Sequence, residues 1–457
     1  MHSDPLIISY HPSFSEEKKY ILDLLFRHFL GFDCRLQEHQ DKRYEVLLPN
    51  QNKLIINDAF FSSITSESYL DIANLPCPVN SDSVFPEDRF SCLSMFGSPS
   101  YSVENENDVL TGHWNNDVIA ASYFMLTRWE ESIPGSKRDE LGRFPESEHL
   151  SVRFNFAQRP IVNEYLVGIK AALQDLDCRI PDLVRSYSVF PEHDIDTAER
   201  FPDGFKLMKS LLGDLFQGRG PQAVQNTWNS GISRFLKKGL DPFEKYDFLM
   251  DVSESAGLKS CFYFIGGQGI DSDLYPLQSK RLYGSMQRIR ERGHSFAFHP
   301  GLDTYKNPEL YEIELKRIHQ LLPEASTVRQ HYLQFKLPYT LRLAADKALK
   351  LDTSLGFKDR IGFRNGICYS YPFFDILLRK PMNIEVSSFC LMDMALWRMG
   401  LNGDEALKVF KDLADTIHSY QGDFRFIWHN SSFEVAEWVD LSASYRDYVH
   451  AIVFHQT

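Results

Sequence analysis

The stretch SVFPEHDIDTAERF, residues 188–201, places His193, Asp194 and Asp196 directly after an apolar run. Side chains two positions apart in a strand point to the same side, so Asp194 and Asp196 can face one pocket. Carboxylates and imidazoles are costly to bury unless they are paired or bind a metal. The spacing therefore predicts a polar site at the end of a buried strand.

Further polar side chains follow later strand-like runs. They are His299 after SFAF, Arg329 and His331 after STV, and His429 with Asn430 after FRFIW. The carboxyl ends of parallel strands lie at one edge of a sheet, so we expect these side chains to converge. Asp, His and Arg at one edge indicate a metal-assisted hydrolase.

Each residue also has an ordinary structural interpretation. Asp196 can cap a following helix. His299 and His429 can be core histidines that are hydrogen-bonded within the sheet, and His193 can be one as well. Their common position at the ends of successive strands favours a shared site over these separate explanations.

Only a parallel sheet would bring these strand ends together. From residue 185 onward, strand-like runs alternate with helical segments; the runs are SYSVF, SCFYFIG, HSFAFH, STVRQHYLQF, LKLDTS, MNIEVSS and FRFIWHN. This alternation predicts an α/β domain with a mainly parallel sheet, open or closed as a barrel, over residues 185–457. Residues 1–184 mix helix and strand signals, including an amphipathic helix at 118–132, and predict a smaller α+β domain.

Composition excludes several classes of protein. The chain has 457 residues, a net charge of −13 and no Lys/Arg-rich block, which argues against a nucleic-acid partner. Its seven cysteines are scattered, so neither a disulfide framework nor a cysteine zinc site is expected. No leader or membrane-spanning run is recognisable, and this predicts a cytoplasmic protein. No G-x-S-x-G, dinucleotide or P-loop motif occurs.

The motifs HDID, RGHSFAFHP, TVRQHYLQF, LDTSLGF, GFRNGICY and FRFIWHN follow the order of the polysaccharide deacetylase superfamily. The chain resembles a bacterial, two-domain branch of this family, which carries a chitooligosaccharide deacetylase homology domain. The resemblance implies a distorted barrel of about seven strands. It also implies a divalent metal, often zinc, held by one Asp and two His.

The resemblance assigns roles to the strand-end residues. It implies that Asp194 is the catalytic base, Asp196 a metal ligand and His299 the first metal histidine. Arg329 corresponds to an arginine that orients the base, and His429 to the general acid.

Four residues are candidates for supporting roles. Arg364 and Asn430 are candidate substrate contacts, and His193 would orient a ligand or donate to Asp194. The chain departs from the family pattern at the second metal histidine, where Asp303 stands; His331 is the rival for this third ligand position.

These residues predict a metal-dependent hydrolase that removes an acetyl group from an N-acetylated sugar or glycan, with zinc as the expected cofactor and a carbohydrate as substrate. Two alternatives remain open. The chain can hydrolyse another linear amide, or, with one metal histidine missing, it can bind a glycan without cleaving it. Metal separates them, because both hydrolase readings require it and the binding-only reading predicts none.

Overall fold

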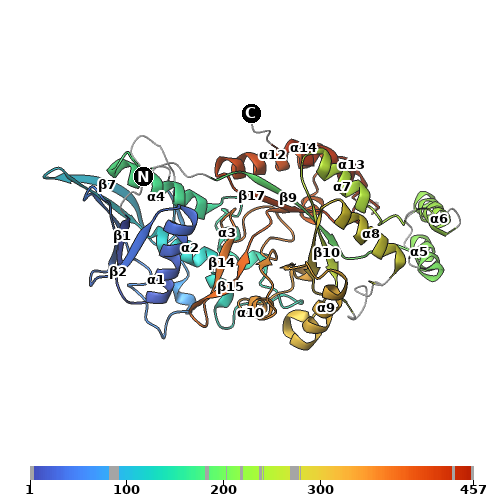
Figure 1. The fold of residues 1–457 in the computed structure, drawn as a ribbon, viewed down its shortest axis with the longest axis horizontal. Coiled ribbons are helices and arrows are strands. Elements are labelled where there is room, and N and C mark those ends of the chain that lie inside the picture. Colours follow the sequence, from blue (N-terminus) through green and yellow to red (C-terminus); the bar gives the residue numbers. More distant parts are fainter. Residues whose placement is uncertain are drawn as a thin grey trace. The chain divides into compact units, whose positions relative to one another are not determined.

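The computed structural model describes residues 5–453, apart from 82–91, 181–184, 202, 217–219, 236–238, 240, 268–276, 278 and 435–437. The chain forms two compact units (Figure 1). Unit 1 comprises residues 1–186, 336–346 and 362–388, and unit 2 comprises residues 187–335, 347–361 and 389–457. The prediction places a single boundary at 184/185, where residue 184 lies outside the described residues. Two later segments of the chain belong to unit 1.

Unit 1 contains a six-stranded mixed sheet in the order β2-β1-β3-β4-β8-β7. Its strands are β1 (Leu6–Tyr10), β2 (Cys34–Glu38), β3 (Arg43–Leu47), β4 (Lys53–Asn57), β7 (Gly97–Glu106) and β8 (Val109–Asn116). In β3 and β4 buried and partly exposed residues alternate, as expected for strands with one face on the core. Between β4 and β7 in the sequence, β5 (Val79–Ser81) and β6 (Cys92–Ser94) form a separate antiparallel pair.

The helices of unit 1 include α1 (Ser15–Leu22), α2 (Val118–Leu126), α3 (Leu150–Arg153) and α4 (Ile161–Leu176). The predicted amphipathic helix at 118–132 is wrong in extent and in character. α2 ends at Leu126 because Arg128 adopts a left-handed backbone with φ of 52°, and a 3-10 turn, Trp129–Ser132, follows. All nine residues of α2 are buried, so the helix is apolar all round and belongs to the core.

The later segments of unit 1 hold α10 (Tyr339–Asp346) and the antiparallel hairpin of β14 (Tyr371–Asp375) and β15 (Lys380–Val386). The run MNIEVSS is a strand, as the pattern predicts, and it forms β15. Its partner in the hairpin, β14, runs antiparallel to it, whereas the prediction places this run in the alternating parallel series.

Unit 2 is an α/β unit with seven strands in the order β13-β12-β11-β10-β9-β17-β16. The strands are β9 (Ser188–Ile195), β10 (Cys261–Ile265), β11 (Ser295–His299), β12 (Thr327–Val328), β13 (Leu351–Asp352), β16 (Leu391–Met392) and β17 (Asp423–Ile427). Every pairing among them is parallel. The apolar runs CFYFI and SFAFH are buried along nearly their whole length, as in a sheet covered on both faces.

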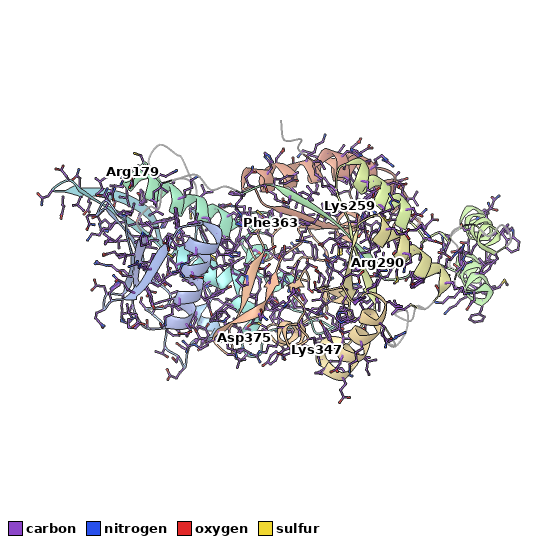
Figure 2. All side chains as sticks on the ribbon, in the orientation of Figure 1. Arg179, Lys259, Arg290, Lys347, Phe363 and Asp375 are labelled. Carbon is purple, nitrogen blue, oxygen red and sulfur yellow. The ribbon has the colours of Figure 1, made fainter. Side chains whose placement is uncertain are left out.

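Helices connect these strands, and side chains fill the interior of each unit (Figure 2). The connecting helices are α5 (Gly204–Phe216), α6 (Pro221–Phe235), α7 (Tyr246–Ser255), α8 (Lys280–Glu291), α9 (Pro308–Leu321), α11 (Asp393–Arg398) and α12 (Gly403–Ser419). Two more helices, α13 (Val439–Ala443) and α14 (Tyr445–Ala451), follow the last strand, β17. Among the described residues no pair joins β13 to β16, so the parallel sheet is confirmed and its closure into a barrel stays a prediction. No helix among the described residues is long and apolar enough to cross a membrane.

Candidate metal centre and active site

Three of the predicted side chains in unit 2 form a cluster that can hold a metal ion. Asp196, His299 and His331 each present a ligand atom, and these atoms lie within 4.8 Å of one another. Asp196 Oδ1 is 3.3 Å from His299 Nε2 and 3.4 Å from His331 Nδ1, and the two ring nitrogens are 3.1 Å apart. We call these three residues the metal trio.

The parallel sheet brings the metal trio together. β9 ends at Ile195, so Asp196 is the first residue beyond it, and His299 is the last residue of β11. His331 begins a 3-10 turn, His331–Leu333, shortly after β12. All three therefore stand at the carboxyl ends of parallel strands, where side chains of neighbouring strands converge.

The trio fits a divalent metal by geometry and by hydrogen bonding. Ligands about 2.0–2.1 Å from a tetrahedral zinc are separated by roughly 3.3 Å, which matches the three separations here. Asp196 Oδ1 is buried and accepts no hydrogen bond. His299 donates from Nδ1 to the Arg329 carbonyl at 2.6 Å, which leaves the lone pair of Nε2 facing the trio. Three protein ligands would leave a fourth position open.

A buried carboxylate, Asp194, lies beside the trio. Arg329 Nη1 donates to its Oδ1 at 2.7 Å, and its Oδ2 is 3.9 Å from His299 Nε2. Burial would raise the pKa of Asp194, but the Arg329 guanidinium outweighs this effect and lowers it. The carboxylate is therefore ionised and held in one orientation.

An imidazole on a different strand end also contacts the trio. His429 Nε2 is 3.6 Å from Asp196 Oδ2, and its Nδ1 is 2.8 Å from Asp393 Oδ1. Burial would lower the pKa of His429, but the carboxylates of Asp393 and Asp196 outweigh it and raise that pKa to about 10. In the absence of a metal the ring is a cation that can donate a proton from Nε2.

Two carboxylates that hold this site in place, Asp393 and Glu192, were not predicted from the sequence. Asp393 follows β16 and accepts from the backbone N–H of His429 at 2.8 Å and from the Ser432 hydroxyl at 2.6 Å. Glu192 accepts a hydrogen bond from Arg329 Nη2 and another, at 2.6 Å, from Arg425. Glu192 stands two positions before Asp194, so the alternation rule that paired Asp194 with Asp196 also places it on their face.

Two predicted residues, His193 and Asn430, form hydrogen bonds to groups outside the trio. His193 lies on the other face of β9, where Nδ1 donates to the Trp428 carbonyl at 2.9 Å and Nε2 is 3.1 Å from the Ser260 hydroxyl. Burial lowers the pKa of His193 to about 4, so it is a neutral core histidine and not a donor to Asp194. Asn430 donates to two backbone carbonyls, of Thr197 and Phe243, both at 2.9 Å, and so connects three loops.

Asp303 and Arg364 also lie elsewhere. Asp303 is about half exposed and pairs with Lys306 at 2.7 Å, so the Asp–His–His cluster contains His331 in its place. Arg364 belongs to unit 1, where its buried guanidinium donates to Glu131 at 2.9 and 3.2 Å. Arg364 thus forms an internal ion pair, and its expected substrate contact stays a prediction.

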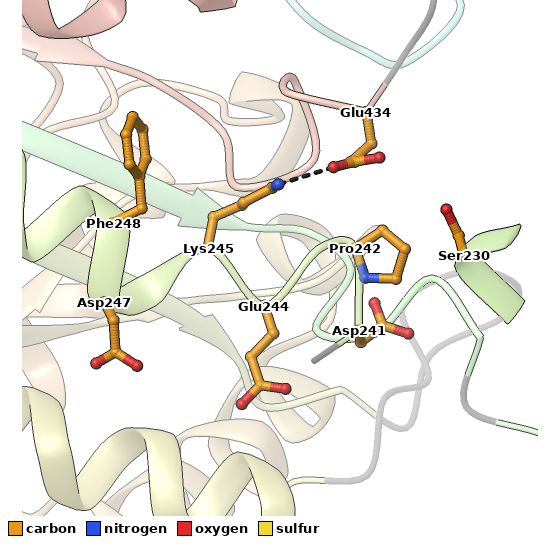
Figure 3. Close-up of a pocket in the computed structure, with 8 residues that line it drawn as sticks. All are labelled: Ser230, Asp241, Pro242, Glu244, Lys245, Asp247, Phe248 and Glu434. Atoms are coloured by element: carbon orange, nitrogen blue, oxygen red, sulfur yellow. Dashed lines mark ion pairs between the residues drawn. The ribbon is translucent and has the colours of Figure 1, made fainter. Parts of the chain in front are cut away.

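A cavity of about 380 Å³ adjoins the loop that follows His429 (Figure 3). It is lined by Ser230, Asp241, Pro242, Glu244, Lys245, Asp247, Phe248 and Glu434. Lys245 and Glu434 form an ion pair of 2.7 Å across it. Asn430 links the candidate site to this cavity. It follows His429 in the chain and donates to the carbonyl of Phe243, which lies next to the lining residues Pro242 and Glu244.

Residues 6–177 match the model of a family of unknown function, DUF7033, and the match ends before β9. No curated protein matches the chain. Among solved structures, a "putative polysaccharide deacetylase" from Mycobacterium smegmatis is similar over 60% of this chain and 87% of that chain, at 12% sequence identity and a TM-score of 0.39. The roles proposed below therefore rest on the residues and geometry of this chain.

Proposed function

We propose that unit 2 is a metal-dependent hydrolase that removes an acetyl group from an N-acetylated sugar or glycan by cleaving its amide bond. One observation carries the proposal: beside the Asp–His–His cluster lie a buried, ionised carboxylate, Asp194, 3.9 Å from His299, and a buried imidazole, His429, 3.6 Å from Asp196. A base and an acid beside a Lewis-acid site are what amide hydrolysis requires.

The chain's own residues move the protons. A divalent metal held by the trio supplies polarisation of the amide carbonyl and a lowered pKa for an attacking water. Asp194, held by Arg329, accepts the proton of that water as the new C–O bond forms. His429, oriented by Asp393, donates a proton to the leaving nitrogen as the C–N bond breaks. The products are acetate and a free amine.

A carbohydrate substrate is the most specific part of the proposal, and two features support it. The strand-end motifs resemble those of polysaccharide deacetylases. Tyr332, next to His331 with ring centroids 4.2 Å apart, is about half exposed and can stack on a sugar ring. Phe298, another aromatic near the site, is fully buried against Tyr311 and is a core residue.

The alternatives differ in how far they depend on the trio. Hydrolysis of another linear amide uses the same residues, and the choice between the two substrates rests on substrate assays. The binding-only alternative depends on a missing metal ligand. His331 occupies the third position of the cluster, which favours a hydrolase.

Metal analysis is the first test. The purified protein is loaded with zinc, freed of excess metal by gel filtration and compared with the variants Asp196→Ala, His299→Ala and His331→Ala. We expect about one metal per chain in the parent and none retained in the variants. Asp303→Ala is the matched control and should keep its metal, since Asp303 pairs with Lys306 instead. A parent that binds no metal under any loading condition contradicts the proposal.

Acetate release tests the reaction itself. The zinc-loaded protein is incubated with N-acetylated chito-oligosaccharides and, separately, with a simple acetylated amine. We expect acetate from the sugar, at least about a hundredfold less from Asp194→Asn and from His429→Ala, and retained metal in both variants. Acetate from the simple amide alone would favour the second substrate class.

A further inference from the structure

A helical hairpin in unit 2 exposes a concentration of large apolar side chains. α5 and α6 follow each other between β9 and α7, and Figure 1 draws them side by side. Leu207 of α5 packs directly on Gly231 of α6, and the Thr227 hydroxyl donates to the buried Asp214 at 2.6 Å. The two helices therefore use one face of α5 to hold each other.

The opposite side of α5 is an exposed apolar stripe. It consists of Phe205, Met208, Leu212, Leu215 and Phe216, at the three- and four-residue spacing of one helix face. Phe205 is 77% exposed and Phe216 is 87% exposed. Seven of the twenty exposed large apolar side chains among the described residues lie between 205 and 235, so this surface is concentrated on the hairpin.

The hairpin also differs in charge from the rest of the chain. Residues 204–238 contain six basic residues and one acidic residue, a net charge of +5, whereas the whole chain has −13. On the helical spacing Lys206 and Lys209 lie along one edge of the stripe of α5. Both are exposed, and no acidic partner is recorded for either among the described residues.

We propose that this hairpin docks on the surface of an anionic phospholipid membrane. An exposed row of Phe, Leu and Met with lysines along one edge is a pattern of a helix that lies in the plane of the interface. Its apolar side chains enter the headgroup layer, and the lysines contact lipid phosphates. The binding is peripheral, and it is independent of the proposed hydrolase.

Charge and chemistry favour a membrane over two other occupants. A second copy of the chain would bring identical stripes together in a two-fold contact, and with them the exposed, like-charged Lys206 and Lys209 of both copies. A nucleic acid would use the basic residues, but it would leave the aliphatic stripe in water. A lipid surface accommodates both features at once.

Vesicle co-sedimentation tests the proposal with the full-length chain. The probes are vesicles of phosphatidylcholine alone and of equal parts phosphatidylcholine and phosphatidylglycerol, at low and at high salt. We expect binding to the anionic vesicles, with affinity at least about tenfold lower on the neutral ones and at high salt. Absence of binding to anionic vesicles at low salt overturns the proposal.

Two variants separate the apolar and the charged contributions. The triple variant Phe205→Ser, Leu215→Ser and Phe216→Ser changes only exposed side chains, and we expect it to lower the affinity on the order of a hundredfold. The double variant Lys206→Glu and Lys209→Glu should lower it by about tenfold or more. Ile313→Ser on α9 and Lys408→Glu on α12, both exposed, are the matched controls and should bind as the parent does.

Other results contradict the proposal. If the serine variant binds vesicles as well as the parent, the stripe is not the docking surface. If the parent is a dimer by analytical ultracentrifugation, the serine variant is a monomer and neither sediments with vesicles, the occupant is a second copy. Acetate release from a soluble substrate is expected to be the same in parent and variants, so a failure of the hydrolase proposal would leave this test intact.

Discussion

Each unit of the protein contains a buried network of charged side chains, and the two networks differ in where they end. The unit 1 network consists of Arg128, Glu130, Glu131, His149 and Arg364. The unit 2 network consists of Asp194, Arg329, Glu192 and Arg425. Both replace water around buried charges with charge-assisted hydrogen bonds, which is the condition for burying them at all.

The carboxylates of the unit 1 network accept hydrogen bonds from groups within unit 1. Glu131 accepts hydrogen bonds from Arg128 and Arg364, and Glu130 accepts from Arg128 and from the backbone N–H of Leu150. Burial would raise the pKa of Glu131, but the two guanidinium groups outweigh it and lower that pKa to about 2. Such a network stabilises the positions of its own segments, including the later segment that carries Arg364.

The unit 2 network adjoins the metal trio, whose side chains have ligand atoms available for a metal ion. Asp194 gives one oxygen to Arg329 and turns the other towards His299 of the metal trio. Buried charge alone therefore does not indicate a site. A site needs an ionised oxygen that faces a ligand set with a position left open.

The largest expected effect comes from removing the central arginine of each network. Arg329→Ala leaves Asp194 without its cation and Glu192 with Arg425 alone. Arg128→Ala leaves Glu130 without its cation and Glu131 with Arg364 alone. Each should lower the free energy of unfolding by about 3–5 kcal/mol, measured by denaturant titration. Only Arg329→Ala should abolish acetate release. Loss of activity in a folded, metal-loaded Arg128→Ala protein would contradict the distinction between the two networks.

A smaller effect is expected at Asp352, a buried carboxylate of unit 2 that neither network includes. Its Oδ2 accepts no hydrogen bond, and burial raises its pKa to about 6. The folded state therefore holds the proton more tightly than the unfolded state, and stability should fall as the pH rises from about 4 to about 6.

Asp352→Asn removes this dependence and keeps an acceptor for the Ser354 N–H. We expect the variant to match the parent near pH 4 and to be more stable by up to about 3 kcal/mol near pH 7. Denaturant titrations at both pH values measure this difference. Equal stability of the two proteins at pH 7 would show that the carboxylate is stabilised by other groups.

The smallest effect on stability is expected from neutralising one outer carboxylate of each network. Glu192→Gln and Glu130→Gln should each cost about 2 kcal/mol, because a charged hydrogen bond becomes a neutral one. Glu192→Gln should also lower kcat about ten- to hundredfold with little change in KM, because Arg329 then holds Asp194 less firmly. Glu130→Gln should leave kcat unchanged. A Glu192→Gln protein with parental kcat would show that Glu192 only stabilises the fold.

The hydrophobic pattern was enough to predict where many strands lie in the sequence. It was not enough to predict which strands pair with each other. The runs around β10 and β11 are apolar throughout, and this pattern appears in strands buried on both faces. The same pattern could not show that β15 pairs antiparallel with β14, because periodicity reports burial and not the partner. The end of α2 was also missed, since the left-handed backbone at Arg128 follows from its surroundings.

In the candidate site, spacing along the chain was sufficient for the residues that a regular strand orients. Asp194 and Asp196 share a face because strand side chains alternate, and His299 is the last residue of its strand. The same rule applies to Glu192, which was not predicted because its role depends on two arginines, Arg329 and Arg425, from other parts of the sheet. Asp393 follows a strand of only two residues, which is too short for a pattern to reveal.

The third ligand of the trio was beyond the reach of spacing, which left Asp303 and His331 as rivals. Both lie in turns with irregular backbone: Asp303 has a φ of 65°, and Tyr332, next to His331, has a φ of 55°. The direction of a side chain in such a turn depends on packing and hydrogen bonds from distant segments. His331 joins the trio because its turn follows the short strand β12, which pairs with β11 beside His299, whereas Asp303 turns towards Lys306.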